Sequence, residues 1–307
     1  MKIDVIIPLY KPGKELFELL NCLKEQTLPV HRIILLNTEE KYFEELVYGT
    51  DFYTRFSDLV EVYHLSKREF DHGGTRRMGV RKSTAEVFVM MTQDALPADE
   101  KLLEQLISHL SGEVAVAYAR QLPKEGCHLP EQISRAFNYP EKSMVKRAQD
   151  QERLGIKTYF CSNVCAAYRR DIYDSLGGFV KHAIFNEDMI YAGSAVQAGY
   201  AIAYEAEAKV YHSHNYTVGE QFRRNFDLGV SQADHPEIFG QLRSESEGKR
   251  LVKTTTQELR KQKKTKMIPY FYLQCVGKYA GFLCGRHYKS LPRRLVLALT
   301  SNREYWK

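Results

Sequence analysis

Short apolar runs alternate with longer amphipathic segments over the first third of the chain. The apolar runs lie at residues 3–9, 32–36, 60–65, 87–91 and 114–118. Each has the length of a strand, and the first, residues 3–9, has so little polar interruption that it is expected to be buried on both faces. Between them, apolar residues recur at helical spacing, as in Leu16, Leu19 and Leu23, and further helices are expected near residues 39–47 and 75–83. This alternation predicts an α/β fold with a mostly parallel, doubly wound sheet and helices on both faces.

The pattern is less regular in the middle of the chain. Pro97 stands where the first residue of a helix is expected. Residues 159–168 and 201–211 have the composition of strands, and Asn186 is placed to cap a helix over residues 187–197. These elements extend the α/β domain to about residue 240.

The last part of the chain differs in charge. Residues 241–307 carry 16 Lys and Arg against 4 Asp and Glu, whereas the whole chain has 44 against 38. An apolar stripe runs along one predicted helix there, through Ile268, Phe271, Tyr272, Cys275, Val276, Tyr279, Phe282 and Leu283. We therefore divide the chain into an α/β domain, residues 1–240, and a basic amphipathic helical extension, residues 241–307. The extension either packs on the main domain with a solvated basic face or meets an anionic partner, membrane lipid or nucleic acid.

Composition excludes several classes of protein. Hydrophobic residues make up 44% of the chain and aromatic residues 12%, which is enough for a core and excludes a disordered or fibrous chain. No apolar run approaches the roughly 20 residues of a membrane-spanning helix, and the N-terminus does not resemble a secretory signal. The six cysteines form no CxxC pair and are expected to be reduced. A cytoplasmic location follows from these observations.

Candidate chemistry collects where the predicted strands end. Pro8, Leu9 and Tyr10 end the first strand, Asn37 and Glu39 follow the second, the segment HGGTRRMG follows the third, and Thr92, Gln93 and Asp94 follow the fourth. Ligands of open parallel sheets bind at the carboxyl ends of the strands. The convergence of polar residues at four such ends indicates a binding site there.

Each of these segments has a chemical use and a plainer alternative. Gly73 and Gly74 would let the backbone approach a ligand before a helix whose N-terminus, with Arg76 or Arg77, attracts phosphate; a glycine turn with solvated arginines is the alternative. Asp94 can hold a divalent cation that bridges two phosphates, or it can cap a helix. Asn37 or Glu39 can hydrogen-bond a base or a ribose.

Two later motifs add candidate catalytic groups. Glu187 and Asp188 open a predicted helix, where they either complement the helix dipole or supply a general base. His212 and His214 are two residues apart at a strand end, so both project to one face. One of them could complete a metal site with Asp94, and a packed or solvated histidine pair is the alternative.

Together these motifs resemble the family-two glycosyltransferases, which are inverting enzymes of the GT-A fold that use nucleotide-diphosphate sugars. The resemblance rests on IPLY ending the first strand, Asp94, the Glu187–Asp188 pair after LGGF, and the late strand-end histidine, and it spans about residues 3–215. The combination of HGGTR, TQDA, NED and HSHNYT is similar to bacterial rhamnosyltransferases of cell-wall and surface-polysaccharide synthesis.

The resemblance implies roles for individual residues. It implies that Asp188, beside Glu187, is the catalytic base and that Asp94 and His212 hold Mg²⁺ or Mn²⁺. The residues implied to bind the nucleotide sugar are Pro8, Leu9, Tyr10, Asn37, Glu39, Arg76, Gln93 and Asp94. Two positions depart from the family pattern, since Thr92 replaces the first carboxylate of the usual DxD and Arg77 stands where many relatives have Asn.

The resemblance also implies the reaction. Asp188 would deprotonate an acceptor hydroxyl, which attacks the anomeric carbon opposite the leaving diphosphate. The donor would be a nucleotide-diphosphate sugar, dTDP-rhamnose by the narrower similarity, and the acceptor a polysaccharide or a lipid-linked glycan. The basic extension would then face the inner surface of the cell membrane, with no nucleic acid as partner.

Two other functions compete with this interpretation. The segment GGTR also occurs in a glycine-rich loop of sugar-phosphate nucleotidyltransferases, although there it follows the first strand and here the third. A non-catalytic module that binds nucleotide sugars or nucleic acid would leave the convergent strand-end residues without a role.

Overall fold

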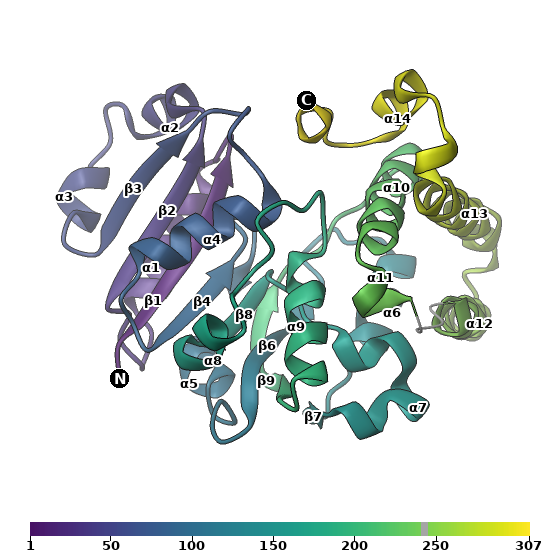
Figure 1. Ribbon diagram of the computed structural model, residues 1–307, viewed down its shortest axis with the longest axis horizontal. Helices are drawn as coiled ribbons and strands as arrows, with labels where there is room; N and C mark the ends of the chain where they lie inside the picture. The colour runs from purple at the N-terminus through teal and green to yellow at the C-terminus, as the bar shows by residue number, and fades with distance from the viewer. Residues whose placement is uncertain (241–244) are drawn as a thin grey trace.

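The computed structural model describes residues 1–240 and 245–307 (Figure 1). Its centre is one nine-stranded sheet in the order β3-β2-β1-β4-β8-β6-β9-β5, with β7 paired to β9. The strands are β1 Ile3–Tyr10, β2 Arg32–Thr38, β3 Val60–Leu65, β4 Val87–Met91, β5 Leu96–Pro97, β6 Val114–Leu122, β7 Met144–Lys146, β8 Cys165–Arg169 and β9 Ala201–Tyr211. The predicted α/β sheet is confirmed.

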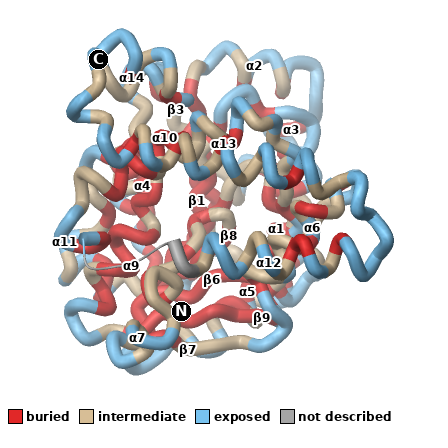
Figure 2. The backbone as a smooth tube through the Cα atoms, turned by 90° about the vertical axis from the view of Figure 1, so that its right-hand side faces the viewer, coloured by how far each residue is buried: buried red, intermediate tan, exposed pale blue. Residues whose placement is uncertain are grey.

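Helices cover both faces of the sheet, as predicted. One face packs against α1 Glu15–Lys24, α2 Glu40–Val47, α3 Phe52–Phe56 and α5 Leu102–Leu106; the other packs against α4 His72–Lys82, α8 Arg170–Ser175 and α9 Glu187–Gln197. Each face therefore has its own hydrophobic core. In Figure 2, strands β6, β8 and β9 and helix α9 are largely buried.

The parallel arrangement does not extend through the whole sheet. β1 pairs in parallel with β2 and β4, β2 with β3, and β6 with β9, whereas β8 runs antiparallel between β4 and β6. The strand predicted over residues 159–168 is extended only at its end. The chain first forms a 3₁₀ turn, Gly155–Tyr159, and reaches β8 at Cys165. The direction of β8 brings the loop before it, including Asn163, to the carboxyl ends of β4 and β6.

Two predicted helix starts are wrong. Pro97 lies in the short strand β5, which pairs only with the end of β9, a position that tolerates the missing N–H of proline. Helix α4 begins at His72, because Asp71 caps it by accepting a hydrogen bond of 2.7 Å from the backbone N–H of Gly74. The glycines of HGGTR are thus helical.

Gly73 and Gly74 serve packing in this structure. A Cβ at Gly73 would collide with the carbonyl oxygen of Val180, and one at Gly74 would lie 2.9 Å from that of Lys181. Both glycines therefore allow α4 to approach the loop before α9. The expectation that they admit a ligand to the backbone is replaced by this packing role.

The remaining helices form a layer at the far side of the sheet. They are α6 Leu129–Asn138, α7 Gln151–Leu154, α10 Val218–Asp234, α11 Pro236–Phe239, α12 Glu245–Lys261, α13 Ile268–Arg286 and α14 Arg293–Leu299. The predicted C-terminal helices are confirmed. The predicted boundary between residues 240 and 241 falls where the segment 241–244 lies outside the described residues, and it stays a prediction.

Glycines set the packing of α13 on α10. A Cβ at Gly281 would collide with the carbonyl oxygen of Phe222, and one at Gly285 with that of Phe226. Gly277, one turn earlier, faces Val218 in the same way. The apolar stripe predicted on α13 therefore divides: Phe271 is buried, whereas Tyr272, Val276, Tyr279 and Leu283 are exposed on the opposite side.

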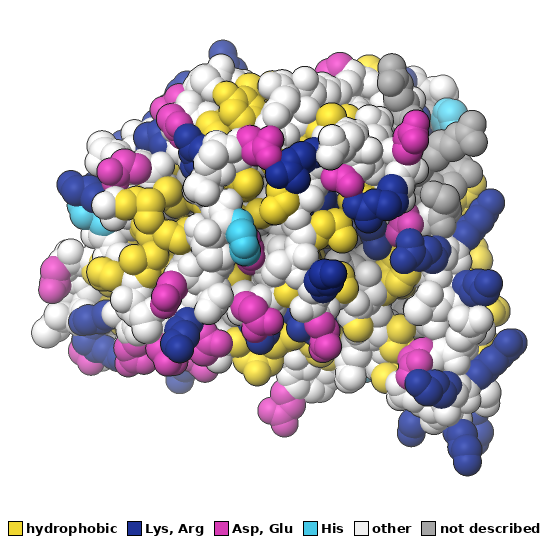
Figure 3. Space-filling model, turned by 90° about the horizontal axis from the view of Figure 1, so that it is seen from below, with side chains coloured by type: hydrophobic (Ala, Val, Ile, Leu, Met, Phe, Trp, Pro, Cys, Tyr) yellow, Lys and Arg dark blue, Asp and Glu magenta, His cyan; other side chains and the backbone are white. Residues whose placement is uncertain are grey.

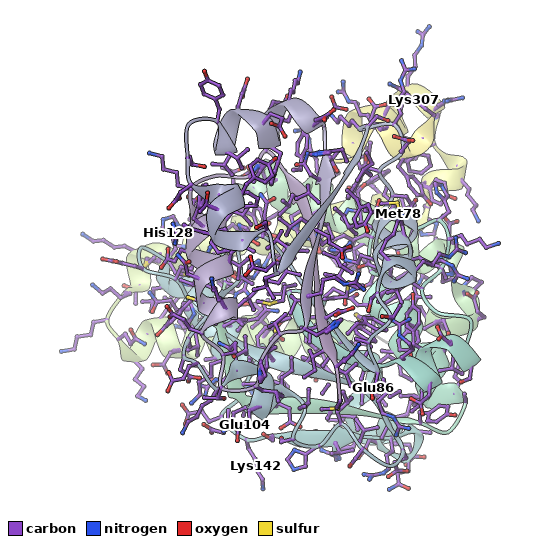
Figure 4. All side chains as sticks on the ribbon, turned by 90° about the vertical axis from the view of Figure 1, so that its left-hand side faces the viewer. Met78, Glu86, Glu104, His128, Lys142 and Lys307 are labelled. Atoms are coloured by element: carbon purple, nitrogen blue, oxygen red, sulfur yellow. The ribbon has the colours of Figure 1, made fainter. Side chains whose placement is uncertain are left out.

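The C-terminal residues return toward the carboxyl ends of the parallel strands. Figure 4 shows Lys307 at the opposite end of the molecule from Glu86, which directly precedes β4. The ring of Tyr305 stacks on His182 with ring centroids 4.2 Å apart. No helix within residues 1–240 and 245–307 is long and apolar enough to cross a membrane.

We predict that Gly281→Ala destabilises the α10–α13 pair. The new methyl group must displace backbone, and overpacking of this kind costs about 1–3 kcal/mol. Urea unfolding measures the change. Gly219→Ala in α10 is the matched control, because its Cβ would meet nothing within 4 Å; equal stability of the two variants would contradict the close packing.

Candidate active site

The carboxyl ends of β1, β2 and β4 meet at one edge of the sheet. Leu9 is in register with Asn37, and Tyr10 with Thr38. The side chain of Gln93, after β4, accepts a hydrogen bond from the Tyr10 backbone N–H (2.9 Å) and donates one to its carbonyl oxygen (3.1 Å). Gln93 thereby ties the ends of β1 and β4 together.

This edge has an aromatic and cationic surface on its outer side. The exposed ring of Tyr10 packs edge-on against Tyr42, with centroids 5.8 Å apart. The ammonium groups of Lys11 and Lys67 lie 5.6 and 5.8 Å from the centre of the Tyr10 ring. An aromatic face flanked by two cations suits a nucleotide base and its phosphates. Tyr42, Lys11 and Lys67 were not among the predicted residues.

Of the predicted nucleotide residues, several are held by the protein itself. Asn37 is fully buried and donates to the carbonyl oxygen of Glu39 (3.2 Å), while its Oδ1 has no partner among the described residues. One carboxylate oxygen of Glu39 accepts from the backbone N–H of Lys67 (2.6 Å). The Leu9 side chain lies in the core and that of Pro8 is partly buried, so Leu9 offers a ligand only its backbone.

A second cluster lies at the ends of β4 and β9. One oxygen of Asp94 lies 3.4 Å from Nε2 of His212 and 3.1 Å from Nε2 of His214, and the two Nε2 atoms are 3.1 Å apart. The three groups are thus placed as potential ligands of one metal ion. Asp94 and His212 are brought together as predicted, and His214 joins them.

The hydrogen bonds behind His212 test whether this cluster suits a metal. Nδ1 of His212 lies 3.1 Å from Oε1 of Gln121 and 3.3 Å from a guanidinium nitrogen of Arg135. Both partners lie on the Nδ1 side of the ring, so Nε2 of His212 is left facing Asp94 and His214. One carboxylate oxygen and two imidazole nitrogens, all within 4.8 Å of one another, are ligand atoms that divalent metal ions accept. The donor set therefore fits a divalent cation.

The electrostatics of the cluster agree with this assignment. Burial opposes ionisation of Asp94, but the imidazoles of His212 and His214 outweigh it and hold the pKa of the carboxyl well below its usual range. Burial also lowers the pKa of His212, which keeps this ring neutral. An ionised carboxylate and a neutral imidazole are the forms that bind a metal.

The predicted carboxylate pair lies at the start of α9. Asn163, in the loop before β8, donates its backbone N–H to Asp188 (2.9 Å) and its side-chain amide to Glu187 (2.8 Å). The guanidinium of Arg76 lies 3.2 Å from Glu187, and both side chains are buried. Asn186 precedes the helix in a left-handed conformation, and within the described chain its side chain does not cap α9 as expected.

The two carboxyl groups have opposite electrostatic properties. Burial raises the pKa of Glu187, but the charge of Arg76 outweighs it and the pKa is lowered. For Asp188, burial and the neighbouring negative charge of Glu187 raise the pKa to about 7. These two effects outweigh the dipole of α9, which favours the ionised form of Asp188. A carboxyl group poised near neutral pH can accept a proton from a hydroxyl.

Gln121 and the adjacent residues Ser162 and Asn163 connect the carboxylate pair to the metal cluster. Gln121 contacts His212 on one side and donates to the hydroxyl of Ser162 (2.9 Å) on the other, next to Asn163. Sequence reasoning missed Gln121 and Asn163, since neither lies in a motif. Their only sequence signal is their place at the end of one strand and just before another.

A buried lysine holds the loop that carries Asn163. Lys146, 3% exposed, donates to the carbonyl oxygens of Lys157 (3.0 Å) and Phe160 and to the hydroxyl of Tyr118 (3.2 Å). Burial lowers its pKa to about 7. Lys146 thus fixes the chain three residues before Asn163.

Two predicted phosphate ligands have internal partners here. Arg76 pairs with Glu187, so contact with a diphosphate would require this buried ion pair to open. Arg77 donates to the carbonyl oxygens of Gly177 and Phe179, which fixes the LGGF turn. Binding of the diphosphate by Arg76 stays a prediction.

Solved structures share this architecture. A mannosyltransferase, PcManGT, from Pyrobaculum calidifontis, determined with GDP-mannose and Mn²⁺, aligns with a TM-score of 0.57 at 16% identity, over 99% of this chain and 87% of its own. TarS from S. aureus aligns with a TM-score of 0.52 at 16% identity, over 98% and 83% of the two chains. The fold is that of the GT-A glycosyltransferases.

Sequence relatives define the family more closely. The family model described as glycosyl transferase family 2 matches residues 4–177. The O-antigen chain rhamnosyltransferase RfbN of Salmonella typhimurium is 39% identical over 100% of this chain and 96% of its own, and WbaN of Salmonella anatum is 36% identical over 98% and 95%. The chain belongs to glycosyltransferase family 2. It is therefore a nucleotide-sugar glycosyltransferase, and neither alternative function is supported.

We predict that Asp188→Asn lowers kcat about 10²-fold or more, the usual scale for loss of a general base. Because protonation of Asp188 blocks proton acceptance, the wild-type rate should fall as the pH drops below about 7. Steady-state transfer assays across pH measure both effects. Asp174→Asn, an exposed carboxylate on α8, is the control; full turnover by Asp188→Asn would refute the assignment.

We predict that Lys146→Met lowers kcat with little change in the KM for the donor. Loss of the ammonium group frees the loop before β8 and leaves buried carbonyl groups unpaired, at a cost of about 1–3 kcal/mol. Kinetics and urea unfolding together measure this. Lys142→Met is the control, since Figure 4 shows Lys142 pointing into solvent; a wild-type kcat in a folded Lys146→Met protein would contradict the positioning role.

Proposed function

We propose that this enzyme transfers rhamnose from dTDP-rhamnose, with inversion, to a glycan or lipid-linked glycan acceptor. The observation that carries the proposal is the connection, through Gln121 and the adjacent residues Ser162 and Asn163, of a base with a pKa of about 7, Asp188, to the cluster of Asp94, His212 and His214. Full-length similarity to two O-antigen chain rhamnosyltransferases supports the sugar.

The residues divide the reaction between them. Tyr10, with Lys11 and Lys67, would receive the nucleotide on its aromatic and cationic surface. Asp188 would remove the proton of the acceptor hydroxyl, whose oxygen then bonds to the anomeric carbon while the bond to the diphosphate breaks on the opposite face. Asn163 holds the Asp188 carboxylate in one orientation during this transfer.

The proposed cofactor is Mg²⁺ or Mn²⁺. Asp94, His212 and His214 would hold the ion, which when bound offsets the charge of the leaving diphosphate. Two imidazoles beside one carboxylate favour Mn²⁺ over Mg²⁺, which prefers oxygen ligands. Thr92, in place of the first acid of DxD, removes one oxygen ligand from the usual motif.

A comparison of donors tests the sugar assignment. Hydrolysis of dTDP-rhamnose, UDP-glucose and GDP-mannose without acceptor should be fastest for dTDP-rhamnose. Release of dTDP is the measured quantity, and Asp94→Asn is the blank for adventitious hydrolysis. A clear preference for another sugar nucleotide would overturn the choice of rhamnose.

We predict that His214→Ala and Asp94→Asn each weaken Mn²⁺ binding in the presence of dTDP by about tenfold or more, the scale for losing one metal contact. Calorimetric titration with Mn²⁺ measures the loss. His235→Ala is the control, because His235 pairs with Glu237 in a separate region. Unchanged Mn²⁺ affinity in both cluster variants would exclude this metal site.

The outer face of α13 is the proposed membrane contact. Tyr272, Val276 and Tyr279 are 42%, 64% and 52% exposed on one stripe. Lys and Arg side chains gather on the right-hand side of Figure 3, the side on which Figure 1 places α12 and α13. Each basic residue near an anionic bilayer contributes about 1 kcal/mol of attraction. The enzyme would thus sit peripherally on the inner face of the membrane.

We predict that the protein pellets with vesicles containing anionic phospholipid and much less with neutral ones, and that salt weakens the effect. Val276→Asp combined with Tyr279→Asp should abolish pelleting. Tyr53→Asp, equally exposed on α3, should leave it unchanged. Equal pelleting of all three proteins would show that the stripe does not contact lipid.

A further inference from the structure

A large cavity separates the active site from the C-terminal helices. Its volume is about 1470 Å³, and it is framed by α6, α10, α12 and α13. Pockets for small molecules usually measure about 300–1,000 Å³. The occupant of this space is therefore larger than a single sugar ring.

The two ends of the cavity differ in chemistry. At the inner end lie His214 of the metal cluster and Met189, the neighbour of the base Asp188. At the outer end lie Val276, Tyr279 and Leu283 of the exposed stripe on α13. The cavity thus leads from the catalytic groups to the surface that we assign to the membrane.

Apolar side chains line the path between the ends. They come from several elements: Ile156, Leu228, Leu251, Val252, Met267 and Phe282. Polar side chains also line the cavity, among them Ser134, Asn138 and Gln221, and they offer partners to the hydroxyl groups of a glycan. The apolar part of the lining suits a hydrocarbon chain.

The charge along the cavity is positive. Its two acidic residues are neutralised by partners, Glu131 by Arg135 (2.9 Å) and Glu247 by Lys157 (2.9 Å). Lys253 and Arg260 on α12, with Lys278 on α13, also line the space, and none of the three forms an ion pair with a side chain that the structure describes. Unpaired cations beside an apolar wall favour an occupant with an anionic group.

We propose that this cavity binds the acceptor as a lipid phosphate or diphosphate, with the hydrocarbon chain on the apolar wall and the phosphate against Lys253 and Arg260. The glycan part then points to His214 and Asp188. This inference rests on the proposed transfer to a lipid-linked acceptor and names where the lipid is held. It places the lipid inside the protein and not only in the bilayer beside it.

Binding of farnesyl diphosphate in solution, without vesicles and below its micelle concentration, tests the site. Calorimetry should detect binding of farnesyl diphosphate that is at least about tenfold tighter than that of farnesol or pyrophosphate, because only the first has both chain and charge. If pyrophosphate binds as tightly as farnesyl diphosphate, the cavity recognises only the anionic group, and the proposal is overturned. Equal binding of farnesol would overturn the role of the cations.

Matched variants locate the binding. Lys253→Gln with Arg260→Gln should weaken farnesyl diphosphate about tenfold or more, whereas Lys261→Gln with Lys264→Gln, exposed and outside the cavity wall, should change it less than about twofold. Equal effects of the two pairs would overturn the site.

The donor reaction separates this proposal from the proposed function. Hydrolysis of dTDP-rhamnose without acceptor should be unchanged in the Lys253 and Arg260 variant, since both residues lie away from the donor edge. If dTDP-rhamnose is not a donor, the assignment of rhamnose is wrong. Calorimetry with farnesyl diphosphate still tests whether the cavity binds a lipid phosphate. If farnesyl diphosphate does not bind and dTDP-rhamnose is hydrolysed, only the cavity proposal fails.

Discussion

The hydrogen bonds of Asn163 are the constraint on which the rest of the active site depends. Its backbone and side chain bind both acidic residues at the start of α9. Asn163 can do so only because β8 runs antiparallel between β4 and β6, which brings the preceding loop to the carboxyl ends of the parallel strands. Without that reversed strand, α9 would begin beside the sheet without the Asn163 contacts that hold both of its carboxylates.

Glu187 and Asp188 do not share charge equally, and this difference gives the two carboxyl groups different pKa values. Arg76 neutralises Glu187 at 3.2 Å, so Glu187 remains ionised although it is buried. Burial of Asp188 and the neighbouring charge of Glu187 together raise the pKa of Asp188. Removal of Arg76 would leave a buried, unpaired carboxylate, which is strongly unfavourable. The arginine of HGGTR thus affects catalysis through Glu187 even if it never touches a phosphate.

The sequence predicted the parts of the molecule that local patterns determine. Strands β1 to β4 and their strand-end polar groups follow from periodicity and from the geometry of parallel sheets, and the family resemblance added the pairing of Asp94 with His212. The direction of β8 and the buried partners Gln121, Asn163 and Lys146 depend on contacts between distant segments, which periodicity does not record. Gly73 and Gly74 show a related limit, because a glycine needed for helix packing and one needed for ligand approach look alike in a sequence.

Helix α13 shows how one packing requirement determines a second property. Gly277, Gly281 and Gly285 recur every four residues and let the backbone of α13 lie directly on α10. Because this small-residue face must point inward, the apolar face on the other side of the helix cannot be buried against the same neighbour. Tyr272, Val276 and Tyr279 are therefore left exposed and border the cavity. The glycine contact that fixes the extension to the enzyme thereby also presents an apolar surface next to the acceptor side of the active site.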